Sequence, residues 1–500
     1  METTFWALIP PILAIVISLI TKEVNLSLFV GIIVGALLYT RGNVFATATT
    51  IFDIMSNKVQ GNMGVLIFII LLGMIVYLMN LSGATHKYTQ WTSKWLKTKR
   101  QSLLATMALG IIIFVDDYFN CLTVGTVMRP ITDKQKVSRE KLAYIIDSTA
   151  APICIIAPIS SWAAAVSSSL PDGSSIDGFN LFIKTIFCNY YSWFSLALIL
   201  FTTLLATDFG KMRKYEIAAM RGESTYYASG EQDDKTKYPG KVIDLLLPVI
   251  VLIILSIVSM LYTGGMFSGE ETSIADAFAN CDAITGLAMG ALYTIAFLAM
   301  LYLPRKIVTP KQFLDGLVEG FKNMVPATLI LVFAWTLSGI CGRDYLNAGG
   351  FVANLVEQYS VELTFMPAIF FVVAMLLAFS TGTSWGTFAI LLPITVFVFG
   401  DQMTSLMIMT TAAVLGGSIC GDHISPISDT TILSSTGAEC DHINHVESQM
   451  QYGLLVASIS FICYLAGGLL DDQMIALALG TALLLVIVGI IRKINGTTEI

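Results

Sequence analysis

Long apolar segments separated by short polar ones make up most of the chain, and some of the apolar segments are interrupted near their middle. A helix that crosses a membrane needs roughly 20 apolar residues, or about 17 when it is short. The uninterrupted apolar segments lie at residues 6–20, 26–39, 64–79, 190–206, 242–262, 283–303, 325–341, 452–468 and 474–491. The first two are short, but the pattern as a whole predicts an all-α polytopic membrane protein.

Two further apolar segments carry polar residues that a continuous membrane span would not tolerate. Residues 103–131 contain Asp116, Asp117 and Asn120, which leave two arms of about 13 residues, or about 19 Å of helix, against a hydrocarbon core of about 30 Å. Neither arm crosses the core alone, so we expect a re-entrant hairpin. Residues 364–400, interrupted by Ser, Thr and Gly between 380 and 386, predict a second hairpin.

Proline and glycine predict broken helices at residues 142–170 and 404–436. Proline removes an amide donor and clashes with the carbonyl group four residues earlier, and glycine weakens a helix. Freed backbone groups and ionisable side chains are tolerated at membrane depth only inside a protein-lined or watery cavity, which marks an ion or substrate path. The residues expected to break these helices and the second hairpin are Pro152, Pro158, Gly382, Gly416, Gly417, Gly421 and Pro426.

The same order of elements occurs twice along the chain: three helices, a hairpin, a broken helix and a helix. Residues 1–206 form the first copy, a polar linker follows at 207–241, and residues 242–469 form the second copy, before an extra helix and tail at 470–500. We therefore expect about 11 transmembrane helices plus two re-entrant hairpins. Many secondary transporters arrange two such copies around a site at the middle of the membrane.

The distribution of charge predicts the orientation of the chain. Five basic residues and no acidic residue lie between 82 and 102, whereas the loop at 263–282 has four acidic residues and no basic one. Loops on the cytoplasmic side carry an excess of Lys and Arg. We therefore expect the N-terminus outside and the C-terminus in the cytoplasm, which makes the two copies an inverted repeat.

Composition narrows the classes of protein further. With 55% hydrophobic residues, 13% charged residues and a mean hydropathy of +0.75, the chain is too apolar for a soluble protein, and membrane lipid is its expected surrounding. The net charge of −7 does not indicate a nucleic-acid partner. The eight cysteines are scattered singly without a Cys-x-x-Cys pair. No basic region or cleavage site surrounds the first apolar segment, so a retained N-terminal helix is expected.

Carboxylates inside the interrupted segments are the candidate ion ligands. The adjacent Asp116 and Asp117 cannot both remain ionised cheaply at membrane depth without a cation. Asp147 stands beside Ser148 and Thr149, and carboxylate, hydroxyl and freed carbonyl oxygens suit a hard cation such as Na⁺. We predict that Na⁺ is bound by the carboxylates of Asp116, Asp117, Asp147, Asp422 and Asp429.

Neutral and titratable neighbours complete the predicted site. The hydroxyl-rich tip of the second hairpin offers a half-helix N-terminus to an anion and carbonyl groups to a cation. His423 could change its charge near neutral pH and relay protons. The further candidate ion-binding or substrate-binding residues are Asn120, Ser148, Thr149, Ser380, Thr381, Thr383, Ser384, His423, Ser428 and Thr430.

Each of these assignments has a structural alternative. One of Asp116 and Asp117 could cap the second arm of its hairpin, and Asp147 could cap a helix or link two domains. His423 could satisfy a local hydrogen bond, and residues 380–387 could form a plain tight turn.

Two other patterns point to chemistry that we do not expect here. Gly382-Thr-Ser-Trp-Gly386 matches the nucleophile-elbow string of serine hydrolases, but that motif needs a strand-to-helix turn in an α/β sheet. Cys440, His442 and His445 have the spacing of metal ligands. No second cluster accompanies them, so we expect a solvated cytoplasmic loop.

Three stretches together carry a family resemblance. They are Phe114-Val-Asp-Asp-Tyr-Phe-Asn120, Ser380-Thr-Gly-Thr-Ser-Trp-Gly-Thr387 and Gly421-Asp-His-Ile-Ser-Pro-Ile-Ser-Asp-Thr-Thr431. With the chain length and the order of the hairpins, they resemble the signatures of the NhaC family of sodium/proton antiporters, which includes malate/sodium-lactate antiporters. The resemblance implies a bacterial-type plasma (inner) membrane, sodium-coupled exchange, an elevator-like movement of the hairpin domain and a homodimer.

The predicted function is secondary antiport of cytoplasmic Na⁺ for external H⁺, in which protonation of a carboxylate releases Na⁺. Na⁺ and H⁺ are cargo, so no cofactor is expected, and the chain is not expected to be an enzyme. The main alternative is an organic-anion exchanger of the malate/lactate type or an amino acid transporter, for which the hairpin tip would bind the substrate. An ion channel is a further alternative.

Overall fold

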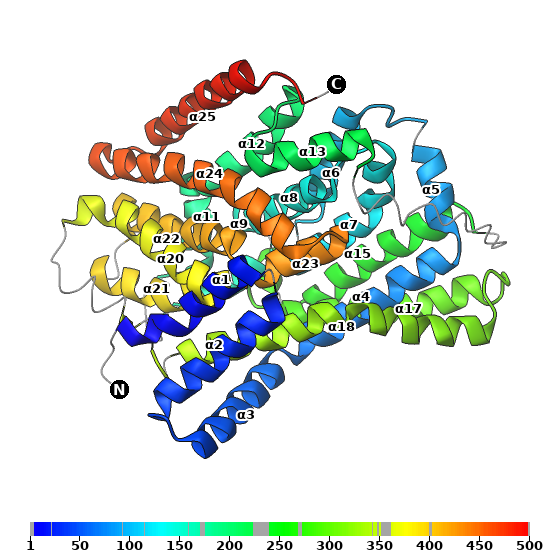
Figure 1. Cartoon of the computed structure of the whole chain (residues 1–500), viewed down its shortest axis with the longest axis horizontal. Helices are drawn as coiled ribbons and strands as arrows, with labels where there is room; N and C mark the ends of the chain where they lie inside the picture. The colour runs from blue at the N-terminus through cyan, green and yellow to red at the C-terminus, as the bar shows by residue number, and fades with distance from the viewer. Residues whose placement is uncertain are drawn as a thin grey trace.

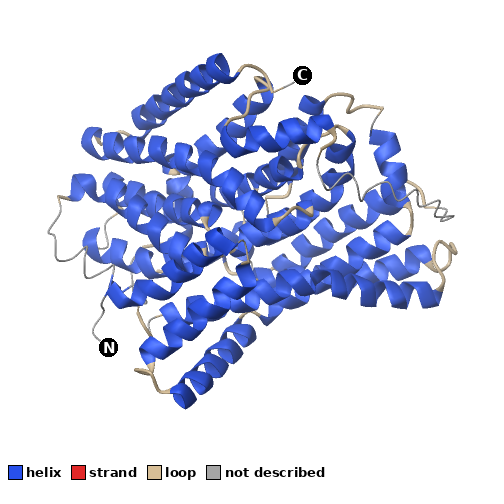
Figure 2. Cartoon of the chain, in the orientation of Figure 1, coloured by secondary structure: helices blue, strands red, loops and turns tan. Residues whose placement is uncertain are grey.

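The computed structural model of this 500-residue chain describes most of the sequence. The described residues are 5–21, 23–92, 94–114, 116–158, 160–170, 176–223, 240–268, 273–342, 344–347, 350–351, 362–399 and 403–498. All regular secondary structure within these ranges is helical (Figure 2). The predicted all-α class is therefore confirmed.

Several helices have the length and composition of membrane spans. Within the described residues, 7 helices qualify, or up to 9 if each of two bent pairs forms one span. The spans predicted at residues 6–20 and 325–341 contain shorter apolar helices, Phe5–Ala14 and Leu331–Cys341. The chain is thus a multi-pass membrane protein, while the expected total of about 11 crossings stays a prediction.

The first half contains a helix that the apolar pattern did not predict. α3 (Val44–Gly61) follows α2 (Val24–Tyr39) after a bend of 119°. Thr, Asp, Asn and Lys interrupt its apolar positions, so its sequence does not resemble a membrane span. The Asn43 side chain caps α3 by accepting a hydrogen bond from the Ala46 amide. The other helices of this region are α1 (Ile9–Thr21), α4 (Met63–Leu81) and α5 (Ala84–Thr92).

Helix breaks lie in both interrupted apolar segments of the first half, the predicted hairpin at 103–131 and the predicted broken helix at 142–170. α6 (Lys99–Ile112) and α7 (Asp117–Lys134) occupy the predicted hairpin. α8 (Arg139–Thr149) and α9 (Ala151–Ile156) are separated at Ala150, whose backbone angles are not helical. Pro152 lies in the first turn of α9, and Pro158 lies in the non-helical segment after it. The helices that follow are α10 (Ser161–Ser168), α11 (Gly178–Thr185), α12 (Tyr190–Leu204) and α13 (Gly210–Arg221).

The second half has corresponding breaks. α20 (Met366–Thr381) and α21 (Ser384–Phe399) meet at Gly382, whose φ of +69° is left-handed and therefore favours glycine. α22 (Ser405–Ile424) and α23 (Asp429–Ala438) are separated by four residues that include Pro426. The remaining helices are α15 (Ile243–Thr263), α16 (Ile274–Ala279), α17 (Ala283–Tyr302), α18 (Pro310–Cys341), α24 (His442–Leu470) and α25 (Gln473–Asn495).

Gly416, Gly417 and Gly421 do not break their helix, so that prediction is wrong. All three lie inside α22. A Cβ atom on Gly417 or Gly421 would collide with the backbone of α20, and one on Gly416 would press on side chains of neighbouring helices. These glycines therefore allow close helix packing, and the break follows them, at the segment that contains Pro426.

The two largest hydrophobic cores lie among helices that are labelled in Figure 1. One includes buried side chains of α4, α15 and α17 together with α7 and α23. The other includes buried side chains of α12, α20, α22 and α24. α8 contributes Ile146 to the first core and Ile145 to the second. The break between α22 and α23, near the centre of Figure 1, therefore lies where the two cores meet.

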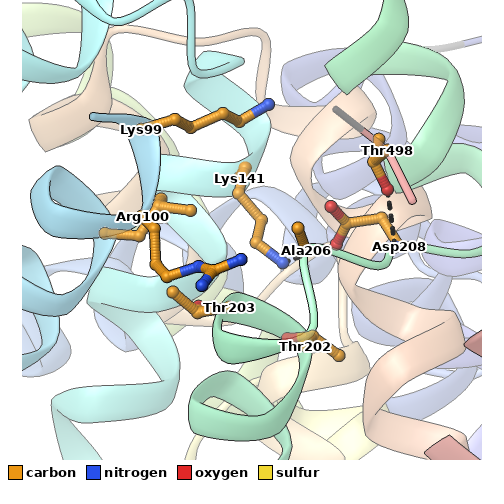
Figure 3. Close-up of a pocket in the computed structure, with 9 residues that line it drawn as sticks. Lys99, Arg100, Lys141, Thr202, Thr203, Ala206, Asp208 and Thr498 are labelled. Carbon is orange, nitrogen blue, oxygen red and sulfur yellow. Dashed lines mark hydrogen bonds and ion pairs between the residues drawn. The ribbon is translucent and has the colours of Figure 1, made fainter. Parts of the chain in front are cut away.

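A buried ion pair holds the start of α8. Lys141 Nζ lies 2.5 Å from Asp208 Oδ1, and only 1% and 7% of these side chains are exposed. The Tyr452 hydroxyl donates to the same carboxylate oxygen at 2.7 Å. The Asp208 amide donates to the Thr498 hydroxyl at 2.9 Å, which brings the C-terminal tail to this pair (Figure 3). The first part of the predicted linker is therefore packed, and residues 224–239 lie outside the described ranges.

We expect Lys141→Met to destabilise the protein by about 3–5 kcal/mol, because Asp208 would keep a buried carboxylate without its cation. Thermal unfolding in detergent should show a lower Tm, and adding Asp208→Asn should recover part of the loss. Lys211→Met is the matched control, since the side chains of its ion pair with Glu447 are 43% and 15% exposed. Such a pair contributes about 0–1 kcal/mol. Equal falls in Tm for the two lysine variants would contradict the prediction.

Candidate functional site

Buried carboxylates from α22 and α23 meet a tyrosine of α7 at the start of α23. The Tyr118 hydroxyl donates a hydrogen bond of 2.7 Å to Asp429 Oδ2. The Thr430 hydroxyl donates one of 3.3 Å to Asp422 Oδ2. All four side chains are buried. At the break before α23, Tyr118 of the first half therefore bonds to Asp429, and Asp422 lies beside it through the neighbouring Thr430.

Asp147 approaches the same segment from α8. Its Oδ2 accepts a hydrogen bond of 3.3 Å from the Thr431 hydroxyl and another from the Gln449 side-chain amide. His445 Nε2 lies 3.6 Å from the same oxygen, and both side chains are fully buried. Gln449 also donates to the carbonyl oxygen of His423 at 2.8 Å. Two successive threonines, Thr430 and Thr431, therefore connect the Asp422 and Asp147 carboxylates.

The tip of the second hairpin contacts this break directly. The Ser384 hydroxyl donates to Asp422 Oδ2 at 2.8 Å. The Asp429 amide donates to the carbonyl oxygen of Gly382 at 3.4 Å. The tip is therefore more than a plain turn, because it bonds to both carboxylate residues of the break.

Asp116 and Asp117 have different roles although they are adjacent. Asp116 is the N-cap of α7, where its side chain accepts a hydrogen bond of 3.0 Å from the Phe119 amide. Asp117 Oδ2 accepts a hydrogen bond of 3.2 Å from the Trp162 indole. The two adjacent carboxylates therefore have different local partners.

Asn120 connects the breaks of the first half. Its side-chain amide donates to the carbonyl oxygens of Gly110 and Ile113 at 2.7 and 2.8 Å, and to that of Thr149 at 3.1 Å. These carbonyl groups lie at the end of α6 and the end of α8, where helix breaks free them. Asn120 thus holds the hairpin against the broken helix through its nitrogen and leaves its oxygen for another contact.

Several of the predicted hydroxyl ligands bond to their own helices. Ser380 and Thr381 both donate to the Leu377 carbonyl oxygen at 2.9 Å. Thr149 donates to that of Ile145 at 2.7 Å. A hydroxyl that donates in this way keeps lone pairs, so its oxygen can still face a cation.

The last predicted residues have local partners as well. The Thr383 hydroxyl accepts from the Gly386 amide at 3.3 Å, and Ser428 caps α23 by accepting from the Thr431 amide at 3.2 Å. Ser148 is buried near the end of α8. The His423 ring lies 3.2 Å from the Tyr191 hydroxyl. His423 therefore has the local hydrogen bond that we gave as the alternative to a role in proton relay.

Four buried oxygen atoms of the site have no hydrogen-bond donor in the described structure. They are Asp147 Oδ1, Asp422 Oδ1, Asn120 Oδ1 and Gln449 Oε1. Burying such an oxygen costs free energy unless a donor or a cation compensates for it. Oxygen atoms of this kind suit Na⁺, which binds carboxylate, amide, carbonyl and hydroxyl oxygens.

The five predicted carboxylates do not form one preformed metal cage. Within the described ranges, no group of three or more His, Cys, Asp and Glu side chains is arranged to hold a metal ion. The physical reason is local: Asp116 turns toward its own helix, and Asp117 turns toward Trp162. A cation at this site would need hydroxyl, amide or carbonyl oxygens in addition to carboxylates.

The prediction of a solvated loop at Cys440 to His445 is wrong for the two histidines. Both lie in α24, His445 is fully buried, and His442 Nε2 lies 2.8 Å from the Pro426 carbonyl oxygen. No role in the candidate site was predicted for Tyr118, Trp162, Thr431 and Gln449. Tyr118 and Thr431 lie inside the quoted motifs and could have been included on that ground. Trp162, His445 and Gln449 had no such signal.

Ser384 does not have the setting of a hydrolase nucleophile. It opens α21 after a helix, and its hydroxyl donates to Asp422. No strand occurs in the part of the chain that the structure describes. The strand-to-helix turn that a nucleophile elbow requires is therefore missing from these residues.

Comparison with known proteins gives a family match. Residues 171–469 match the family model described as the Na⁺/H⁺ antiporter family. An uncharacterized protein of Haemophilus influenzae is 34% identical over 98% of this chain and 96% of its own length. The chain thus resembles a relative of similar length from end to end.

Two relatives with named activities match over about a third of their length. The malate-2H(+)/Na(+)-lactate antiporter of Bacillus subtilis is 30% identical over 36% of this chain and 37% of its own. The arginine/ornithine antiporter ArcD of Halobacterium salinarum is 29% identical over 32% and 33%. Among solved structures, Neisseria gonorrhoeae MtrF aligns over 86% of this chain and 85% of its own, with a TM-score of 0.31 and 12% identity.

Proposed function

Because this chain belongs to the Na⁺/H⁺ antiporter family, of the NhaC type, we propose that it exchanges cytoplasmic Na⁺ for external H⁺ at the carboxylates around the start of α23. Membership of this family makes it a secondary transporter and not an enzyme. Na⁺ and H⁺ would be cargo.

The observation that carries the proposal is the link between Asp147, Asp422 and Asp429 through consecutive residues of one helix start. Thr430 donates to Asp422 and Thr431 donates to Asp147, while Asp429 itself accepts from Tyr118. Unscreened carboxylates so close together repel one another, and either a bound cation or a proton relieves that repulsion. Na⁺ and H⁺ would therefore exclude each other from the site, which couples their movements.

Competition gives a direct test of this mechanism. The Na⁺ concentration for half-maximal proton flux should rise as the pH falls, by up to about tenfold per pH unit when one proton competes with one cation. The measurement uses proteoliposomes with a trapped pH dye, with Na⁺ added at a series of external pH values. A half-maximal concentration that stays constant while only the maximal rate changes would contradict a shared site.

The main alternative is an organic-anion or amino acid exchanger. The local similarity to the malate-2H(+)/Na(+)-lactate antiporter and to the arginine/ornithine antiporter favours it. The same liposomes separate the two functions. Proton flux triggered by Na⁺ alone supports cation/proton antiport, whereas flux that requires malate, lactate or arginine supports the alternative. An ion channel would not drive one solute uphill against another.

Orientation and movement form the remaining part of the proposal. We infer an inverted repeat with the N-terminus outside and the C-terminus in the cytoplasm of a plasma (inner) membrane, as the basic loops favour. In an elevator-like cycle, the hairpins and broken helices would move together against the remaining helices, and a homodimer would provide the fixed frame. Asn120 supports joint movement, because it bonds the end of α6 to the end of α8.

A further inference from the structure

A polar cavity outside the carboxylate site lies between α4, α7, α18 and the end of α23. Its volume is about 300 Å³, which is the size of a small-molecule site. Its polar lining includes Tyr77, Asn80, Thr126, Arg129, Asn323 and Glu439. Tyr77 and Asn80 lie in α4, and Thr126 and Arg129 lie in α7. Asn323 lies in α18, and Glu439 is the C-cap of α23, so four separate segments enclose the cavity.

The cavity lies along the same helices as the carboxylate site. α7 begins at Asp117 and carries Arg129 about 18 Å further on, at a rise of 1.5 Å per residue. α7 and α23 cross closely at Gly125 and Gly437, where a Cβ atom on either glycine would collide with the backbone of the other helix. Both helices therefore start at the carboxylates and run from there to the cavity.

Arg129 is the cation of this cavity, and its acidic partner is replaceable. Arg129 Nη1 lies 2.6 Å from Glu439 Oε1, with 15% of the arginine side chain and 57% of the glutamate side chain exposed. An ion pair whose carboxylate is in solvent is weak, because water solvates that carboxylate nearly as well. Most of the guanidinium, by contrast, is enclosed by the cavity wall.

Glu439 would keep other partners if it left Arg129. Arg139 Nη1 lies 3.6 Å from Glu439 Oε2 and donates a hydrogen bond of 2.9 Å to the Glu439 carbonyl oxygen. Glu439 also occupies the exposed C-cap of α23 in a left-handed conformation. After release from Arg129, the Glu439 carboxylate would therefore stay in solvent beside Arg139, whereas the largely buried Arg129 would need another anion.

We propose that this cavity binds a small organic acid, whose carboxylate takes the place of Glu439 on Arg129. The inference rests on the proposed transport function, since it names a second solute for the same protein. A guanidinium group binds a carboxylate through two parallel N–H groups, which suits Arg129 better than a lysine would. Thr126 and Asn323 also line the cavity, where a hydroxyl group or a second carboxylate of the acid would lie.

Three variants test this exchange of carboxylates. Binding of L-lactate, with one carboxylate, and of L-malate, with two, is measured by titration calorimetry on the purified full-length protein, with chloride as the control anion. Arg129→Gln should weaken binding of at least one acid by tenfold or more. Glu439→Gln should leave that binding unchanged or strengthen it severalfold, because it removes the competing carboxylate. Arg139→Gln is the matched control and should change it by less than about threefold.

The different results expected for Arg129→Gln and Glu439→Gln distinguish binding of the acid by Arg129 from a purely structural role of the ion pair. If the ion pair only holds α7 to α23, both variants should weaken binding equally, and that result would overturn the proposal. Absence of saturable binding of either acid to the wild type would also overturn it. Sodium-triggered proton flux in the same preparations tests the proposed function separately. If Na⁺ triggers proton flux but neither acid binds, only the organic-acid site is refuted. If an acid binds through Arg129 but Na⁺ triggers no proton flux, only the proposed Na⁺/H⁺ antiport is refuted.

Discussion

Asp429→Asn is expected to lower sodium-driven proton flux at least about 100-fold, which corresponds to about 2.7 kcal/mol. A carboxamide can neither exchange a proton nor neutralise a cation, and Asp429 lies where Tyr118 and the tip at Gly382 meet the break. Asparagine has nearly the same shape, so the helix start should survive. Flux is measured with the trapped dye in proteoliposomes across a range of pH.

Asp282→Asn is the control for this prediction. Asp282 is the exposed N-cap of α17, where it accepts a hydrogen bond of 3.0 Å from the Thr285 amide. Asparagine caps helices about as well as aspartate does. The control should therefore keep wild-type flux. If Asp429→Asn also kept wild-type flux with an unchanged pH dependence, Asp429 would have no part in transport.

Gly382→Ala should lower both the Tm and the flux, the latter by at least tenfold. Gly382 has a φ of +69°, and a Cβ atom there would collide with the backbone of Ile427, within the break. A non-glycine residue in this conformation costs about 1–2 kcal/mol by itself. The collision adds to that cost and moves the hairpin tip away from the Asp429 amide and the Asp422 carboxylate.

Gly222→Ala separates backbone strain from the collision. Gly222 ends α13 with a φ of +73°, and among the described residues no atom beyond its chain neighbours and its own helix lies within 4 Å of the position a Cβ would take. This variant should show only the strain of about 1–2 kcal/mol, with flux close to that of the wild type. Equal falls in Tm and flux for the two glycine variants would contradict a role for contact between the tip and the break.

The candidate carboxylates could be located from the sequence, because the free-energy cost of an ionisable side chain in the membrane depends on its own apolar segment. An ionisable side chain inside an apolar segment is expensive at membrane depth wherever the helix packs. Asp116 and Asp117 are adjacent and identical in type, so this cost is the same for both in the sequence. Only the start of α7 separates them, because it directs Asp116 to the Phe119 amide and Asp117 to the Trp162 indole.

Glycine shows a second limit of sequence reasoning. Gly416, Gly417 and Gly421 weaken a helix by their backbone entropy, which predicts a break at α22. The close approach of α20 to α22 offsets that cost, because no larger residue fits between the two backbones. The break follows instead at Pro426, whose missing amide donor no packing contact can replace.

The sequence by itself determined that this protein is helical, embedded in a membrane and interrupted near Asp116, Gly382 and Pro426. Lipid penalises charges and unpaired backbone groups one segment at a time, so these features are written into short stretches. Tertiary structure alone decided which side chains meet there. Gln449 reaches Asp147 across 302 residues of sequence, and His445 joins it from the same helix. Such contacts depend on how distant helices pack, which no local pattern of apolar and polar residues specifies.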